Sequence, residues 1–195
     1  MSPADAVLAL VGAGPRAVGL LERLAANGPL LDGRALTIHV IDPHPPGAGK
    51  IWRQDQSPLL LMNSRAGEVT MFTDASSTCA GPVRPGPTLH QWSDGADAAL
   101  VPDPDLAAEA SALSGDCFAS RRLAGQYLEW CFWRAVRALP DSVRLHVHQA
   151  TAVGLRLGPA HAVTLSNGVH LDVDIAVPEH IMVLANRVRG GTSGA

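Results

Sequence analysis

The amino-acid sequence predicts an α/β fold in which a parallel sheet with flanking helices is joined by a three-stranded antiparallel β-meander. Three observations support this prediction. An apolar run at residues 7–11 enters a glycine turn and then a helical pattern, and a second β-branched run follows at 37–41. A long apolar helix predicted at 121–139 precedes a third strand at 143–148. Three short strand-like runs come next, which a plain repeat of strand–helix units lacks.

The first strand ends in a glycine turn that is suited to hold an anion. Residues 12–17 read GAGPRA, the pattern Gly-x-Gly-x-x-Ala, an accepted variant of the dinucleotide fingerprint. Gly12 permits the sharp turn, Gly14 lets phosphates approach the backbone, and Ala17 lets the helix lie close on the strand. Pro15 suits the first helical position, because the N–H that it lacks would have no intrahelical partner. Backbone N–H groups and the positive helix end would then hold a pyrophosphate.

The surrounding pattern separates this turn from an ordinary strand-to-helix turn. A helix is predicted at 17–26, a break follows at 27–29, and the second strand ends in Asp42. An acid about 20 residues or slightly more after the glycines is placed to accept hydrogen bonds from a ribose diol. Because its charge repels a 2′-phosphate, Asp42 favours FAD or NAD over NADP. We therefore expect residues 7–42 to bind a dinucleotide.

A turn-rich loop and a long irregular segment follow the second strand. Gly47 and Gly49 permit close approach of the backbone to a ligand, and Trp52 is placed to cap it; the alternative is a surface loop with one buried anchor. Residues 53–104 have Gly and Pro throughout and no sustained periodicity. Within them, the apolar run at 59–62 predicts a buried strand or helix turn. We interpret 53–104 as a loop-rich insert that caps the cofactor.

The second half supplies helices and short strands. A short helix is predicted at 105–113, and the helix at 121–139 ends before a proline. The strand at 143–148 alternates, which places His146 and His148 on one face. We interpret them as solvated strand histidines rather than a metal pair, because no third ligand is evident. The meander is predicted from strands at 151–157, 162–165 and 169–173, with a hairpin turn at 166–168.

We expect one domain over residues 1–188, followed by a flexible tail at 189–195. With 195 residues, the chain is long enough for one hydrophobic core and short for two. Residues 175–177 and 181–185 are both strand-like, and the sequence leaves open which of them takes the last position in the sheet.

Charge and composition disfavour several classes of partner and site. The net charge of -3 gives no basic surface for nucleic acid, and no stretch reaches the roughly 20 apolar residues of a membrane span. The three cysteines are widely spaced and form neither a zinc pattern nor a disulfide framework. The first residues lack the basic region of a signal peptide, so we expect a cytoplasmic protein. No metal, nucleic acid or membrane is expected at the site.

Several motifs together carry a resemblance to a known family. They lie at residues 11–16, 20–24, 41–52, 60–63, 70–74, 81–82 and 120–130, and the resemblance covers roughly 6–175. The chain resembles the bacterial FAD/NAD(P)-binding proteins whose N-terminal region is a Rossmann domain. It is more distantly similar to flavin-dependent N-hydroxylating and Baeyer–Villiger monooxygenases, and to the two-dinucleotide-binding fold of glutathione reductase.

The resemblance implies a set of cofactor-binding residues. The FAD pyrophosphate would meet Gly12, Ala13, Gly14, Pro15 and Arg16, the adenosine ribose Asp42, and the adenine the backbone at Ala150, Thr151 and Ala152. The loop residues expected near the cofactor are Gly47, Gly49, Trp52 and Asn63, with Trp52 and Asn63 nearer the flavin. One departure concerns residues 178–180, which read PEH where the family has an Ala-Thr-Gly-like turn over the cofactor.

The function expected from this resemblance is an FAD-binding oxidoreductase, similar to an NAD(P)H-dependent monooxygenase, or its FAD-binding module. NAD(P)H would then bind to a second domain or a partner chain, and the closing FAD segment of the family would also be supplied elsewhere. The alternative is a truncated, non-catalytic dinucleotide-binding subunit or remnant that needs a partner chain or a second copy. A simple NAD-binding domain is disfavoured by the meander. No catalytic residue is identified, since His44 and Asp74 are more typical of solvated loops.

Overall fold

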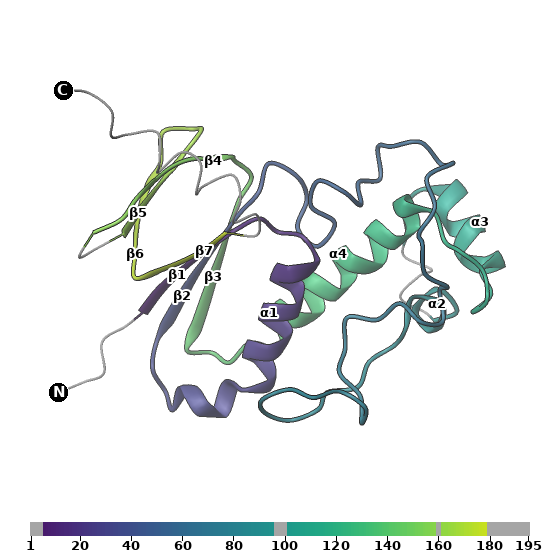
Figure 1. Ribbon diagram of the computed structural model, residues 1–195, viewed down its shortest axis with the longest axis horizontal. Helices are drawn as coiled ribbons and strands as arrows, with labels where there is room; N and C mark the ends of the chain where they lie inside the picture. The colour runs from purple at the N-terminus through teal and green to yellow at the C-terminus, as the bar shows by residue number, and fades with distance from the viewer. Residues whose placement is uncertain (1–5, 96–100, 159–160, 179–195) are drawn as a thin grey trace, which may run out of the picture.

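A four-stranded parallel sheet lies at the centre of the computed structural model, which describes residues 6–95, 101–158 and 161–178 (Figure 1). The strand order is β3-β2-β1-β7, and every pair in it is parallel. A second, antiparallel sheet has the order β4-β5-β6. The strands are β1 (Ala6–Val11), β2 (Leu36–Ile41), β3 (Val143–His148), β4 (Ala152–Arg156), β5 (His161–Leu165), β6 (His170–Val173) and β7 (Ile175–Pro178). The predicted fold class is confirmed.

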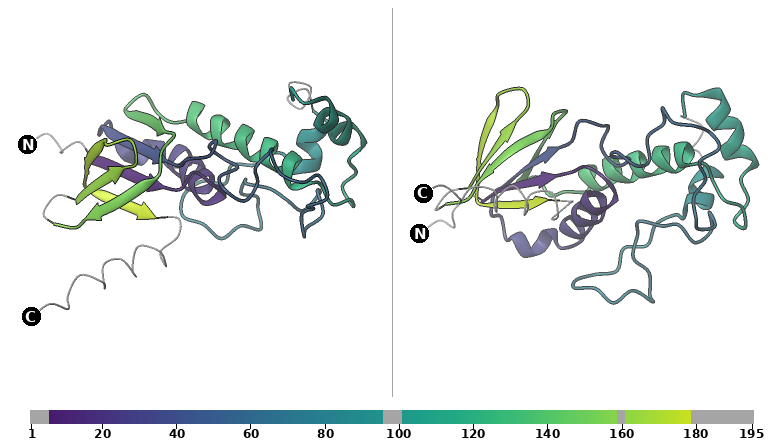
Figure 2. Two further views of the ribbon diagram at one scale, coloured as in Figure 1. Left: turned by 90° about the horizontal axis from the view of Figure 1, so that it is seen from above. Right: turned by 45° about the horizontal axis from the view of Figure 1, so that its top comes forward.

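The two faces of the parallel sheet bury different partners because side chains alternate along each strand. Ile38 and Val40 of β2 are fully buried in one core cluster together with residues of the two long helices, α1 (Pro15–Ala26) and α4 (Arg121–Arg137). Ala9 and Ile41 point the other way, into a second cluster with apolar residues of the meander. Figures 1 and 2 show the resulting layers, with the helices on one side and the meander on the other.

Two shorter helices, α2 (Leu89–Ser93) and α3 (Pro104–Ala112), lie at the far end of α4, away from the sheet (Figure 2). A short 3-10 helix, η1 (Gly28–Leu31), directly follows α1. Thr88 caps α2 through a reciprocal bond with Gln91, and Asp103 caps α3. The predicted helices are thus present, with ends shifted by one or two residues. No described helix is long and apolar enough to cross a membrane.

The last position of the parallel sheet is taken by the first of the two strand-like runs. Ile175 of β7 pairs with Leu8 of β1, and the register continues to Pro178 opposite Val11. Residues 181–185, the other run, lie outside the described residues, as does the expected tail at 189–195.

The expectation of a buried element at 59–62 is wrong. The side chains of Leu59 and Leu61 are 86% and 52% exposed. This segment runs antiparallel to the residues before α4, with Leu61 paired to Ser120 and Met62 N donating to Ala119 O at 2.9 Å. These backbone bonds hold the segment at the surface, so an apolar run here is not a buried one.

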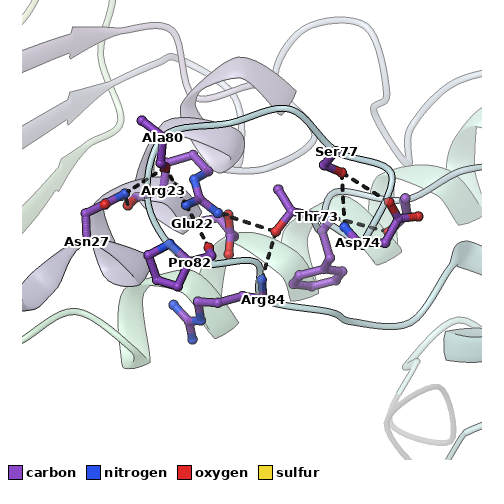
Figure 3. Close-up of polar contacts among 11 residues, drawn as sticks. Glu22, Arg23, Asn27, Thr73, Asp74, Ser77, Ala80, Pro82 and Arg84 are labelled. Carbon is purple, nitrogen blue, oxygen red and sulfur yellow. Dashed lines mark hydrogen bonds and ion pairs between the residues drawn. The ribbon is translucent and has the colours of Figure 1, made fainter.

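A strap of irregular chain at 73–84 is fastened to the end of α1 by Arg23 and, through a bond of 3.5 Å to Ala80 O, by Asn27 (Figure 3). Arg23 Nη2 donates to the carbonyl oxygens of Ala80 and Pro82, each at 2.9 Å, and Nη1 lies 3.4 Å from Thr73 Oγ1. Nη1 also pairs with Glu22 Oε2 at 3.4 Å, although Glu22 is only 4% exposed. The strap and the buried carboxylate therefore share one cation.

Candidate dinucleotide-binding site

A cavity of about 660 Å³ opens at the carboxyl ends of β1 and β2. This is the edge at which parallel α/β sheets bind their ligands. Three segments meet there: the glycine turn after β1, the loop after β2, and the start of β4. The lining residues are Val11, Gly12, Gly14, Pro15, Arg16, Ile41, Asp42, Pro43, His44, Ala48, Lys50, Ile51, Trp52, Thr151, Ala152 and Pro178.

The glycine turn has the geometry that its sequence predicts. Gly12 has φ = 112°, in the region that favours glycine, and its N–H donates to Ile41 O at 2.8 Å. Gly14 is the N-cap residue of α1 and Pro15 is its first helical residue. Since Gly14 has no side chain to cap the helix, this helix start faces the cavity with its backbone. The turn therefore fits the approach of a pyrophosphate.

Asp42 holds the site together from within. Its Oδ2 accepts a hydrogen bond from Ala13 N and its Oδ1 accepts one from His44 N, both at 2.8 Å. The side chain thus joins the glycine turn to the loop after β2, and the residue is only 8% exposed. Each carboxylate oxygen keeps a second lone pair, so the predicted ribose contact remains open. Sequence reasoning gave Asp42 a ligand role alone and missed this internal one.

Gly47 and Gly49 shape the loop rather than line the cavity. Gly47 has φ = 90° and donates its N–H to Ala13 O at 2.6 Å, and a Cβ there would overlap the backbone of α4 at Leu128. A Cβ on Gly49 would lie 3.0 Å from Gly14 Cα. The two glycines let the loop pack between the glycine turn and α4. That packing brings the residues between and after them to the cavity.

Trp52 lies where this loop meets α4. It lines the cavity, and the Arg121 guanidinium carbon lies 5.7 Å from its ring centroid. Gly125 of α4 makes room for the Trp52 carbonyl, because a Cβ at Gly125 would overlap that oxygen. The tryptophan is thus supported on one side by α4 and faces the cavity on the other.

The other expected residues are placed as follows. Thr151 and Ala152 line the cavity, whereas Ala150 is 5% exposed and packs in the core beneath them. Ala13 is buried behind the turn. Asn63 is exposed, follows the segment at 59–62 and lies outside the cavity lining.

Three basic residues line the cavity: Arg16, His44 and Lys50. The positive charges of Arg16 and Lys50 complement the pyrophosphate expected at the turn. Sequence reasoning assigned Arg16 to this role, but it gave Lys50 none. The signal for Lys50 was its position in the sequence, directly after the second loop glycine.

The structure also changes the interpretation of the strand histidines. His39 of β2 joins His146 and His148 of β3, and its Nδ1 lies 2.9 Å from Nε2 of His148. His146 and His148, which were expected to be solvated, therefore have the imidazole of His39 beside them. In the part of the chain that the structure describes, no group of three or more His, Cys, Asp or Glu residues is arranged to hold a metal ion.

Comparison with known proteins identifies the family. Residues 9–177 match the profile of the family described as FAD-NAD(P)-binding. The chain belongs to this family. The family is described by its binding of FAD and NAD(P), which supports the two cofactors expected from the sequence, FAD and NAD(P)H. A lysine monooxygenase from Nocardia farcinica has the same fold, with a TM-score of 0.53 at 16% identity over 91% of this chain and 41% of that one.

Two curated relatives are more similar in sequence. The chain is 43% identical to the nitrosuccinic acid synthase of Aspergillus oryzae over 165 residues, which are 83% of this chain and 23% of that protein. It is 40% identical to the L-aspartate N-monooxygenase (nitrosuccinate-forming) of Streptomyces davaonensis over 197 residues, which are 93% of this chain and 30% of that protein. The chain thus spans less than a third of the length of either relative.

Proposed function

We propose that this chain is the FAD-binding module of a flavin-dependent monooxygenase that N-hydroxylates aspartate, with NAD(P)H as reductant. The cavity between the glycine turn, the Asp42 loop and the start of β4 carries the proposal, because it combines an anion-binding turn with space for a nucleotide. The substrate class comes from the relatives that form nitrosuccinate from L-aspartate. A non-catalytic subunit that only binds a dinucleotide is the competing proposal.

Different residues of the chain would bind different parts of FAD. The turn at Gly12 and Gly14, with Arg16, would hold the pyrophosphate, and Asp42 would accept hydrogen bonds from the ribose. The backbone at Thr151 would lie along the adenine. When bound, the flavin supplies the redox chemistry, while the protein supplies binding, orientation and exclusion of water. The fit rests on Gly12 and Gly14, which line the cavity without side chains.

FAD binding by the purified chain tests this proposal. We expect a chain that is incubated with FAD to keep the flavin absorbance bands through gel filtration, and to gain thermal stability with both FAD and ADP. A colourless chain that neither FAD nor ADP stabilises would contradict the proposal. A chain that is stabilised by ADP but loses FAD on the column would favour the non-catalytic alternative.

An exposed apolar surface beside the cavity suggests where the rest of such an enzyme packs. Ile51 lines the cavity and is 52% exposed, and Leu60, Leu61 and Phe118 are 42%, 52% and 49% exposed. The antiparallel pairing of Leu61 with Ser120 brings the leucines and Phe118 to one segment of the surface. Because the curated relatives are more than three times as long as the matched region, we propose that their remaining polypeptide covers this surface.

Replacing Leu60 and Leu61 with aspartate is expected to weaken this association by about 10- to 100-fold, because two carboxylates would lose their water without gaining partners. The measurement is co-purification of this chain with the remaining polypeptide of the Streptomyces davaonensis relative, expressed together. Leu30→Asp is the matched control, since Leu30 lies on η1 and is 71% exposed. Equal recovery with both variants, or no association of the unmodified chain, would contradict the proposed surface.

A further inference from the structure

Three imidazoles meet on the meander-side face of the parallel sheet. In the strand register, His39 of β2 lies between Ala9 of β1 and His146 of β3, and His148 follows two residues later on the same face. The rings of His39 and His146 are stacked with centroids 5.2 Å apart, and those of His39 and His148 are 5.1 Å apart. The three rings therefore form one cluster, centred on His39.

The shortest contact in this cluster admits only one proton. His39 Nδ1 and His148 Nε2 are 2.9 Å apart, so one nitrogen donates a proton and the other must offer its lone pair. If both rings became imidazolium, two N–H groups would face each other across this distance. Two charges this close would also repel. The contact is thus compatible with a neutral or a singly charged pair and is broken by a second proton.

Within the described residues, no carboxylate is among the groups that shift the pKa values of His39 and His148. Burial, then the charges of His148 and His146, lower the pKa of His39 below 6.5, and burial and His146 lower the pKa of His148. Arg144 is the next residue of β3 on the same face and is also a cation. The meander packs apolar side chains on this sheet, and its Arg156 and Asp172 pair with each other at 4.0 Å. Asp174, the residue after β6, accepts the N–H of Val7 at 2.8 Å. Among the described residues, neither of these two carboxylates is thus a partner of the cluster.

The cluster is connected to the cavity through the backbone of His148. The carbonyl oxygen of His148 accepts the N–H of Asp42 at 3.1 Å and the N–H of Ala150 at 2.9 Å. Asp42 and Thr151, the residue after Ala150, both line the cavity. A separation of β2 and β3 at this end would move both segments at once.

We propose that His39, His146 and His148 form a proton-sensitive support of the nucleotide cavity. Acidification charges the cluster, separates the carboxyl ends of β2 and β3, and weakens the binding of an adenine dinucleotide. The direction follows from linkage. The histidines take up protons less readily when β2 and β3 are paired at this end than when the two strands are separated. The support of the cavity is complete above pH 6.5 and is lost as the pH falls through the lowered pKa values of His39 and His148. That an adenine dinucleotide binds in this cavity is taken from the proposed function.

A titration followed by NMR tests the structural step without any cofactor. We expect the amide resonances of Asp42 and Ala150 to shift with the same midpoint as the rings of His39 and His148 in the unmodified chain. In the His148→Gln variant, which cannot charge, the shift of these two amides is expected to disappear. Amides that stay in place while the rings titrate would overturn the proposal.

FAD affinity at two pH values tests the functional step. The unmodified chain is expected to bind FAD at least about fivefold more weakly at about pH 5.5 than at about pH 7.5. His39→Gln and His148→Gln are expected to reduce this ratio to below about twofold, whereas the control His170→Gln, an exposed histidine bonded to Thr164 on the meander, keeps it. An unchanged ratio in the two cluster variants would overturn the coupling. If FAD fails to bind at every pH, the proposed function fails, and the amide titration alone decides the histidine step.

Discussion

Replacing Asp42 with alanine is expected to weaken FAD binding by about 1–3 kcal/mol, the range for hydrogen-bonding groups that lose their partners. Both carboxylate oxygens accept backbone N–H groups, one from Ala13 and one from His44. The substitution leaves these two N–H groups without an acceptor and releases the glycine turn from the loop after β2. It also removes the proposed ribose contact. Titration calorimetry with FAD measures the combined loss.

Inorganic pyrophosphate separates the two roles of Asp42. A residue that contacted only the ribose would leave pyrophosphate affinity unchanged, or raise it because a negative charge has gone. If the carboxylate shapes the turn, Asp42→Ala is expected to weaken pyrophosphate binding despite that lost repulsion. Asp42→Asn should behave similarly, since its amide offers one acceptor and turns a donor toward the other N–H. Asp172→Ala, with a side chain 83% exposed, is the control and should leave both affinities unchanged.

The parts of the site that the sequence predicts are the local ones. The turn at Gly12 and Gly14 and the start of α1 at Pro15 depend on residues adjacent in the chain, so conformational rules apply to them directly. The position of Asp42 is similarly fixed by the length of one strand–helix–strand unit. The meander follows from the period of three short runs and the turn at 166–168. These features required no knowledge of which distant segments pack together.

The features that the sequence missed depend on pairing between distant segments. His39 meets His146 only because β3 lies beside β2 in one register, and that pairing joins residues more than a hundred positions apart. The exposed side chains at Leu59 and Leu61 reflect the backbone bridge from Leu61 to Ser120. An apolar run alone predicts burial, but it does not reveal that a segment is held at the surface by its neighbour.

The internal role of Asp42 was missed for a different reason. A fingerprint assigns the acid to a ligand, and the same carboxylate has lone pairs for the protein as well. Its bonds to Ala13 and His44 depend on the path of the loop after β2, which Gly47 and Gly49 determine by packing against the turn and α4. The sequence showed these glycines but not what approaches them. Close approach to a ligand and close approach to the protein's own backbone leave the same signal.

Gly125→Ala is expected to destabilise the protein by about 1–3 kcal/mol, although alanine is the better helix former by about 1 kcal/mol. Gly125 lies within α4, and an added Cβ would overlap the carbonyl oxygen of Trp52 and lie 3.6 Å from Ala48 Cβ. These contacts come from backbone and a short side chain, so no flexible group can move away. The loop itself must shift. Unfolding in denaturant measures the change in free energy.

Gly19→Ala provides the matched comparison. Gly19 and Gly125 both lie inside helices, but only at Gly125 would an added Cβ meet other atoms. Nothing lies within 4 Å of a Cβ at Gly19, so this variant is expected to gain about 0.5–1 kcal/mol. Opposite signs for the two variants would show that the loop at Ala48 and Trp52 packs tightly on α4. Equal gains would contradict that packing. Since Ala48 and Trp52 line the cavity, the shifted loop in Gly125→Ala is also expected to lower FAD affinity, whereas Gly19→Ala leaves it unchanged.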